Sequence, residues 1–155
     1  MSRPIVVFDL DGTLVDTAPD LLDSLNHCLD IAGLAKAAPT ELRRFVGMGG
    51  RVMIERAFAA QNKPLTTQQL DELLVHFLQH YGTNIPGNSQ PFPGVIAALD
   101  RLEEAGYVIA VCTNKYEKLS TSLLEALNID HRFAANCGAD TFEFRKPDPR
   151  HLTET

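Results

Sequence analysis

Short, continuous apolar runs alternate along this chain with longer segments in which apolar residues recur every three or four positions. The runs at 4–9, 107–112 and 133–137 are typical of strands buried on both faces of a parallel sheet. Helical spacing marks 95–105 and 116–127, which lie between these runs. The alternation predicts an α/β fold built on a Rossmann-like parallel sheet.

After the first run, the pattern becomes helical throughout and contains no convincing strand. Leucine and phenylalanine recur at helical spacing from residue 17 to residue 83. The helices that we expect there cover 18–34, a segment beginning after Thr40, 51–61 and 67–81. An all-helical segment placed directly after the first strand predicts an inserted cap domain, which in enzymes serves as a lid.

The segment 85–94 marks the return to the α/β pattern, because it carries three prolines and two glycines. We therefore expect a discontinuous α/β core made of 1–16 and 84–155, with 17–83 as the helical cap.

Composition and charge exclude several classes of protein. The 155 residues are 45% hydrophobic and 22% charged, which is typical of a soluble globular protein. A net charge of -6 argues against non-specific binding to nucleic acid. Cys28, Cys112 and Cys137 cannot all pair and lack metal-ligand spacing, which favours a reducing compartment. No stretch has membrane-spanning length and no signal peptide begins the chain, so we expect a cytoplasmic protein without membrane partners.

Two carboxylates follow the first apolar run, where the chain turns. Asp9 and Asp11 lie one residue apart and are followed by Gly12 and Thr13. Because open α/β sheets bind ligands at the carboxyl ends of their strands, these carboxylates are placed for chemistry. A capped turn is the alternative, which the preceding strand and the following glycine disfavour. Two carboxylates so placed can supply a nucleophile, a general acid/base and a ligand for Mg²⁺. These roles together suggest phosphoryl transfer through an aspartyl-phosphate.

Three motifs resemble those of one enzyme superfamily. They are Phe8-Asp-Leu-Asp-Gly-Thr-Leu-Val-Asp16, Val111-Cys-Thr-Asn-Lys115 and Lys146-Pro-Asp-Pro149. In order and spacing they are similar to the haloacid dehalogenase superfamily of phosphatases with a helical cap, and within it most similar to the phosphoglycolate phosphatases. This resemblance implies hydrolysis of a small phosphorylated substrate, with 2-phosphoglycolate as the first candidate.

The resemblance also implies roles for individual residues. Asp9 is the expected nucleophile and a Mg²⁺ ligand. Asp11 is the expected general acid and base, and its backbone carbonyl a second ligand. The residues expected to bind the phosphate or the rest of the substrate are Gly12, Thr13, Thr113, Asn114, Lys115, Lys146 and Arg51. Because dehalogenases and phosphonate hydrolases of this superfamily lack an aspartate at the place of Asp11, its presence favours phosphate-ester hydrolysis or phosphosugar mutase chemistry.

One motif of the superfamily is missing. A Gly-Asp pair that completes the metal site is expected on a further strand beyond Lys146, and the sequence ends at Thr155. The resemblance therefore predicts a C-terminally truncated chain with an incomplete core and weak Mg²⁺ binding. It also predicts that the first strand is an exposed edge prone to self-association. A non-catalytic chain and an enzyme completed by a second polypeptide remain open beside an active phosphatase.

Two further groups of residues are candidates for sites. His76 and His80 lie four apart on an expected helix and suit metal binding, but no third ligand is evident. Arg43, Arg44 and Arg56 are interpreted as solvated helix positions, whereas Arg51 follows a glycine-rich loop that resembles the substrate-facing cap loop of the superfamily.

Overall fold

The computed structural model describes residues 3–155 and divides the chain into two compact units. Met1–Asp16 and Gln90–Thr155 form the first, here called the sheet unit, and Thr17–Ser89 form the second, the helical unit. The chain leaves the helical unit at Ser89 rather than at 83, because Asn88 and Ser89 hydrogen-bond to Asp20 at the start of that unit.

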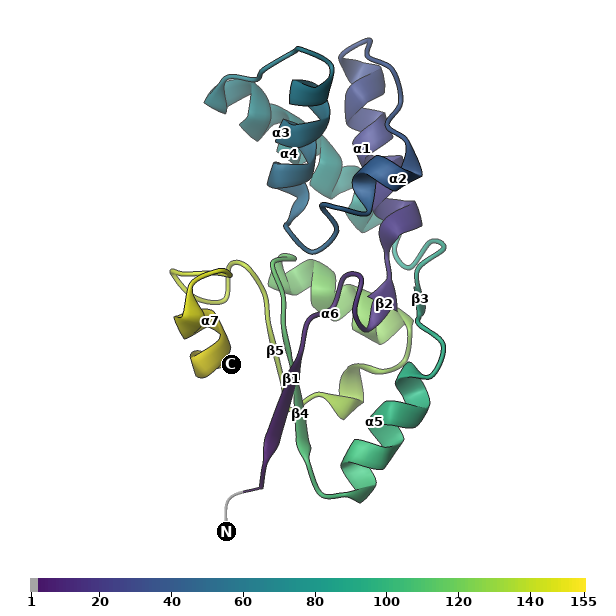
Figure 1. The fold of residues 1–155 in the computed structure, drawn as a ribbon, viewed down its shortest axis with the longest axis vertical. Coiled ribbons are helices and arrows are strands. Elements are labelled where there is room, and N and C mark those ends of the chain that lie inside the picture. Colours follow the sequence, from purple (N-terminus) through teal and green to yellow (C-terminus); the bar gives the residue numbers. More distant parts are fainter. Residues whose placement is uncertain (1–2) are drawn as a thin grey trace. The chain divides into compact units, whose positions relative to one another are not determined.

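The sheet unit contains a parallel three-stranded sheet, whose strands are labelled in Figure 1. Their pairing gives the order β1-β4-β5. The strands are β1 (Ile5–Phe8), β4 (Val108–Cys112) and β5 (Ala135–Cys137). Parallel pairing brings the carboxyl ends of the strands to one edge of the sheet. Asp9 and Thr113, which follow β1 and β4, therefore lie at the same edge.

Helices complete the sheet unit, as the alternating pattern predicts. They are α5 (Val95–Glu104), α6 (Glu117–Ala126), α7 (Pro149–Glu154) and the 3₁₀ helix η1 (Asp130–Arg132). α5 packs against β4 and α6 against β5. Their inward leucines, Leu99 and Leu123, are fully buried, so helix and sheet share one apolar core.

A second, two-stranded sheet was not predicted. β2 (Val15–Asp16) pairs antiparallel with β3 (Gln90–Pro91). Strands of two residues carry no hydrophobic periodicity, so the sequence gives no signal for them. The ladder joins the two segments of the sheet unit where the chain departs for the helical unit and returns from it.

The helical unit consists of four helices, and no strand lies within Thr17–Ser89 of the described chain. They are α1 (Ala18–Ile31), α2 (Pro39–Leu42), α3 (Gly50–Ala60) and α4 (Thr67–Thr83). α1 packs against both α3 and α4, and α3 packs against α4. Gly50 permits the last contact, since a Cβ there would lie 2.8 Å from the ring of Phe77.

Two helices of this unit are shorter than the sequence predicts. α1 ends at Ile31, and Gly33 follows with a φ of +66°, the left-handed conformation that ends many helices. α2 ends at Leu42, before the expected inward residues Phe45 and Val46, which lie in turns. Among residues 3–155, no helix is long and apolar enough to span a membrane.

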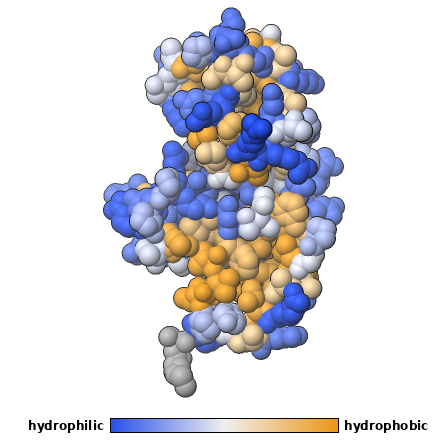
Figure 2. All heavy atoms as spheres, viewed as in Figure 1, coloured by the Kyte–Doolittle hydropathy of each residue, from blue (hydrophilic) through white to orange (hydrophobic). Residues whose placement is uncertain are grey.

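β1 lies at the edge of its sheet, as the sequence predicts. Within the described chain β4 is its only sheet neighbour, and Ile5 is 62% exposed while the rest of β1 is half-buried. Figure 2 shows apolar side chains gathered over β1 on the visible face. By contrast, residues 109–112 of β4 are buried. As an edge strand, β1 presents unpaired backbone groups beside partly exposed apolar side chains, the combination that favours pairing with a further strand.

Candidate active site

Asp9 and Lys146 form the more accessible of two ion pairs at the carboxyl edge of the sheet. The Lys146 ammonium lies 2.9 Å from Asp9 Oδ1, and both side chains are about one-third exposed. The same ammonium donates to the Cys112 carbonyl at 2.8 Å, which ties the ends of β1 and β4 together. A lysine has three N–H donors, so one remains for a phosphoryl oxygen.

Asp11 and Lys115 form the second pair, which is almost fully buried. The Lys115 ammonium lies 3.0 Å from Asp11 Oδ1, and the side chains are 5% and 7% exposed, respectively. The Lys115 backbone is also held firmly, because its N–H donates to Thr113 Oγ1 and its carbonyl accepts from Ala139 N. Gly138 allows this close approach, since a Cβ there would lie 2.3 Å from the Glu117 amide nitrogen.

The turn after Asp11 has the backbone conformation that its sequence suggests. Gly12 adopts a φ of +78°, a left-handed conformation that favours glycine. The amides of Gly12 and Thr13 donate to the carbonyls of Val15 and Leu10, at 2.9 and 3.2 Å. These amides are thus engaged within the turn, and the exposed Thr13 hydroxyl is the group there that remains available to a phosphate.

Thr113 and Asn114 follow β4 at the same edge. Thr113 is completely buried; its amide donates to the Cys137 carbonyl and its hydroxyl accepts the Lys115 amide. Asn114 is half-buried beside it. The structure therefore gives Thr113 a role in shaping the loop that carries Lys115.

His151 is a residue of this site that the sequence did not single out. It is fully buried in α7, and its Nδ1 accepts the backbone N–H of Lys146 at 3.0 Å. Burial, and secondarily the nearby Lys146 charge, lower the pKa of His151 below its usual range. The neutral ring can accept this hydrogen bond, so it fixes the backbone that presents the Lys146 ammonium. A histidine five residues after a lysine has no recognisable spacing signal.

Arg51 belongs to the helical unit and pairs with a carboxylate of that unit. Its guanidinium contacts Asp71 of α4. Its expected contact with the substrate stays a prediction.

His76 and His80 lie with His27 of α1, which the sequence analysis did not consider. The His27 and His80 rings stack at 4.6 Å between centroids, and His27 meets His76 edge-on at 6.3 Å. His80 Nδ1 hydrogen-bonds to Ser24 Oγ at 3.0 Å. Among residues 3–155, no group of three or more histidine, cysteine or acidic side chains is arranged to hold a metal ion.

The carboxylates at the sheet edge are the type of ligand that Mg²⁺ binds. Mg²⁺ takes hard oxygen ligands, and protein sites often supply one or two carboxylates and leave the rest to water and substrate phosphate. Asp9 is accessible enough for this, whereas the Asp11 carboxylate is buried against Lys115, which leaves the Asp11 backbone carbonyl as the expected second ligand.

The fold and this sheet-edge arrangement define a class of hydrolase. The chain belongs to the haloacid dehalogenase-like hydrolase family, whose family model matches residues 6–155. This confirms the family resemblance of the three motifs and the α/β fold class.

The similar proteins carry a more specific name. The chain is 64% identical over its whole length to a phosphoglycolate phosphatase of Mesorhizobium japonicum and covers 68% of that protein. It is 51% identical to one of Agrobacterium fabrum, with 98% of this chain and 65% of that protein covered. A crystal structure from Haemophilus somnus, named a predicted phosphoglycolate phosphatase, superimposes with a TM-score of 0.86 at 31% identity. It matches 98% of this chain and 69% of that one. The chain thus spans about two-thirds of these relatives.

Proposed function

We propose that this chain carries the nucleophile, general acid/base and phosphate-binding lysine of a Mg²⁺-dependent phosphatase that acts on 2-phosphoglycolate or a similar small phosphomonoester. The observation that supports this most directly is the pair of aspartates after β1, each within 3.0 Å of a lysine ammonium. The relatives named phosphoglycolate phosphatase supply the substrate candidate.

The proposed reaction begins at Asp9. One of its carboxylate oxygens attacks phosphorus, the bond to the ester oxygen breaks, and an aspartyl-phosphate forms. The free donor of Lys146 stabilises the charge on the phosphoryl oxygens. Mg²⁺, when bound, would reduce repulsion between the Asp9 carboxylate and the phosphate.

Asp11 would handle the proton in both halves of the reaction. Ionised beside Lys115, it would take a proton from the bound phosphomonoester monoanion and give that proton to the departing alkoxide. It would later take a proton from the water that attacks phosphorus, which restores Asp9, and that proton leaves with the released phosphate. To do so, one Asp11 carboxyl oxygen must face the substrate oxygen while the other stays beside the Lys115 ammonium. Lys115 is therefore proposed as the residue that positions Asp11.

Phosphatase assays test this proposal on the 155-residue chain itself. Hydrolysis of 2-phosphoglycolate and of p-nitrophenyl phosphate is measured with and without Mg²⁺. We expect Mg²⁺-dependent turnover that falls below about a thousandth in Asp9→Asn. Glu143→Gln, an exposed carboxylate in the tail, is the matched control and should retain activity. Activity that survives in Asp9→Asn would refute Asp9 as the nucleophile.

The second candidate is a chain that is not active alone and is completed by another polypeptide. Two observations favour it: the chain spans about two-thirds of its relatives, and the β1 edge is unpaired in the described residues. Its test adds the remaining third of the Mesorhizobium relative as a separate polypeptide. Turnover only in the mixture supports completion in trans, whereas turnover by the chain alone rejects it.

We further propose that the bare edge of β1 drives self-association when the chain is alone, because unpaired apolar strands recruit further strands. Sedimentation should show oligomers or aggregates. A monomer that is also thermally stable by calorimetry would contradict this. The three cysteines, all free and buried, support the proposed cytoplasmic location.

A further inference from the structure

The helical unit contains a pocket of about 500 Å³ that lies wholly within residues 25–61. Its floor is apolar and consists of core side chains of three helices. Leu25 of α1, Leu42 of α2 and Met53 of α3 are each 2% exposed. Pockets of this size and character bind small organic molecules.

The wall of this pocket is formed in advance by hydrogen bonds. Between α1 and α2, the backbone of Ala35 donates to Gln61 Oε1 at 3.0 Å and its carbonyl accepts from Gln61 Nε2 at 2.8 Å. Two residues on, the Ala37 amide donates to Asn26 Oδ1 at 2.9 Å. The connecting segment is thus fixed at two points, so a ligand would not have to order it.

The rim carries an excess of positive charge. Arg44 and Arg56 line the pocket, and within residues 3–155 neither forms an ion pair with a carboxylate. Lys36 also lines it and contacts Asp30 only at 3.9 Å, on the exposed surface. Glu41 is the one acidic side chain among the lining residues. In a chain of net charge -6, this local excess of cations is against the overall trend.

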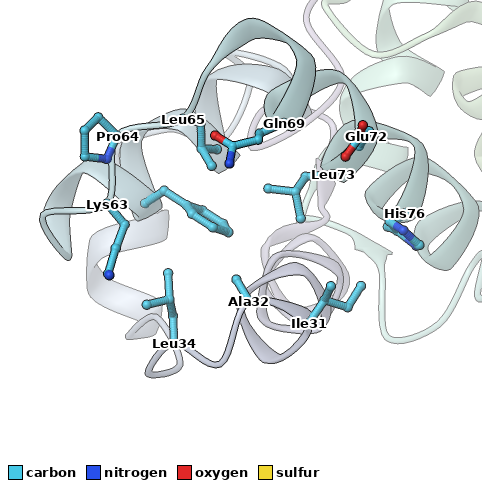
Figure 3. A pocket seen from close by; sticks show the side chains of 11 residues that line it. Ile31, Ala32, Leu34, Lys63, Pro64, Leu65, Gln69, Glu72, Leu73 and His76 are labelled. Atoms are coloured by element: carbon cyan, nitrogen blue, oxygen red, sulfur yellow. The ribbon is translucent and has the colours of Figure 1, made fainter.

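A second pocket in the same unit differs from the first in the charge of its lining, which makes it a poorer site for an anion. Figure 3 shows this hollow of about 340 Å³, with Leu34, Leu65 and Leu73 around it. Its lining includes both Lys63 and Glu72, charges of opposite sign, so an anion gains no consistent attraction there. The pocket with Arg44 and Arg56 has both the larger volume and the net positive lining.

From these observations we propose that the pocket between α1, α2 and α3 binds a small amphipathic carboxylate. Its apolar body lies on Leu25, Leu42 and Met53, and its carboxylate accepts hydrogen bonds from Arg44 and Arg56. Guanidinium groups match a carboxylate with two parallel donors, which gives both affinity and orientation. This site uses no residue of the sheet unit, so its test is independent of phosphatase activity.

The test measures octanoate binding to the full chain by titration calorimetry and by amide chemical shifts. We expect octanoate to bind with shift changes at the pocket residues, and 1-octanol and acetate to bind at least about fivefold more weakly, because each lacks the charge or the apolar body. Arg44→Gln with Arg56→Gln should weaken octanoate binding by about fivefold or more.

Two further variants make the result decisive. Arg43→Gln removes an exposed arginine that does not line the pocket and should leave binding unchanged. Ala57→Leu, on the pocket side of α3, should fill the space and abolish binding while the melting temperature shows that the unit stays folded. The proposal is overturned by octanol that binds as well as octanoate, by equal losses in the Arg43 and Arg44/Arg56 variants, by shift changes elsewhere, or by no binding at all.

Discussion

Each unit of this protein buries one carboxylate to nearly the same degree, and each neutralises it differently. Asp11 of the sheet unit is 7% exposed and lies against the Lys115 ammonium. Asp20 of the helical unit is 8% exposed and is held by neutral donors, the Asn88 amide at 2.9 Å and the Ser89 hydroxyl. A lysine side chain can turn its ammonium to another anion, whereas a backbone amide and a serine hydroxyl have positions that the local fold sets. The first arrangement therefore suits chemistry and the second suits structure.

The largest expected effect comes from removing the cation of the first pair. Lys115→Met leaves Asp11 charged and buried without its ammonium, which should cost about 3–5 kcal/mol of unfolding free energy. Urea denaturation measures this loss. Lys118→Met, an exposed lysine of α6, is the matched control and should change stability by less than about 0.5 kcal/mol.

A double substitution separates the cost of a stranded charge from the value of the pair. Replacing both residues, Asp11→Leu with Lys115→Met, should recover most of the lost stability while eliminating the proposed phosphatase activity. If Lys115→Met unfolds no more easily than the control, the pair does not neutralise a buried charge and the comparison with Asp20 fails.

A smaller effect is expected in the helical unit. Asp20→Ala leaves the Asn88 amide and the buried Ser89 hydroxyl without their acceptor, which should cost about 2–3 kcal/mol. The measurement is again urea denaturation, with Asp23→Ala, an exposed aspartate of α1, as the control. Equal stability of the two variants would show that Asp20 contributes no more than a surface residue.

The smallest effect concerns pH and a third buried group, His151. Its pKa is lowered by burial, so below its usual value near 6.5 the unfolded chain takes up a proton that the folded chain does not. This contribution to stability is therefore present above that pH and is lost as the pH falls through it. We expect the wild type to lose more stability than His151→Gln between about pH 7.5 and pH 5.5, followed by thermal unfolding at each pH. Parallel losses in the two proteins would contradict the assignment.

The sequence predicted the elements that have strong patterns and missed those that depend on tertiary contact. β1 and β4 are continuous apolar runs, and α4 begins at a Thr66 cap whose side chain accepts the Gln69 amide, so local rules suffice for them. The end of α2 at Leu42 was missed, because apolar spacing continues into the turns that follow.

The residues of the candidate site also fall into those that local sequence predicts and those that only the folded structure reveals. The aspartates after β1 and Lys146 could be named from motif and position. The Lys115–Asp11 contact could not, because it joins segments that are distant in sequence. The hydrogen bond from Lys146 to His151 spans only five residues, but no sequence motif marks it. Arg51, which the resemblance assigns to the substrate, contacts Asp71 within the helical unit, and its role at the substrate stays a prediction.

The paired strands β2 and β3 and the Asp20 contacts have a consequence for the modularity of this protein. Asp16 lies opposite Gln90 in the ladder, and Asp20 accepts hydrogen bonds from Asn88 and Ser89. The first and last residues of the helical unit are therefore held next to each other. For the sheet unit, the inserted segment is thus equivalent to a loop whose two ends lie side by side, and the length of that loop does not change the ladder. A short hairpin turn between Asp16 and Gln90 would satisfy the same ladder, and the helical unit could be exchanged for another of different size without rebuilding the sheet.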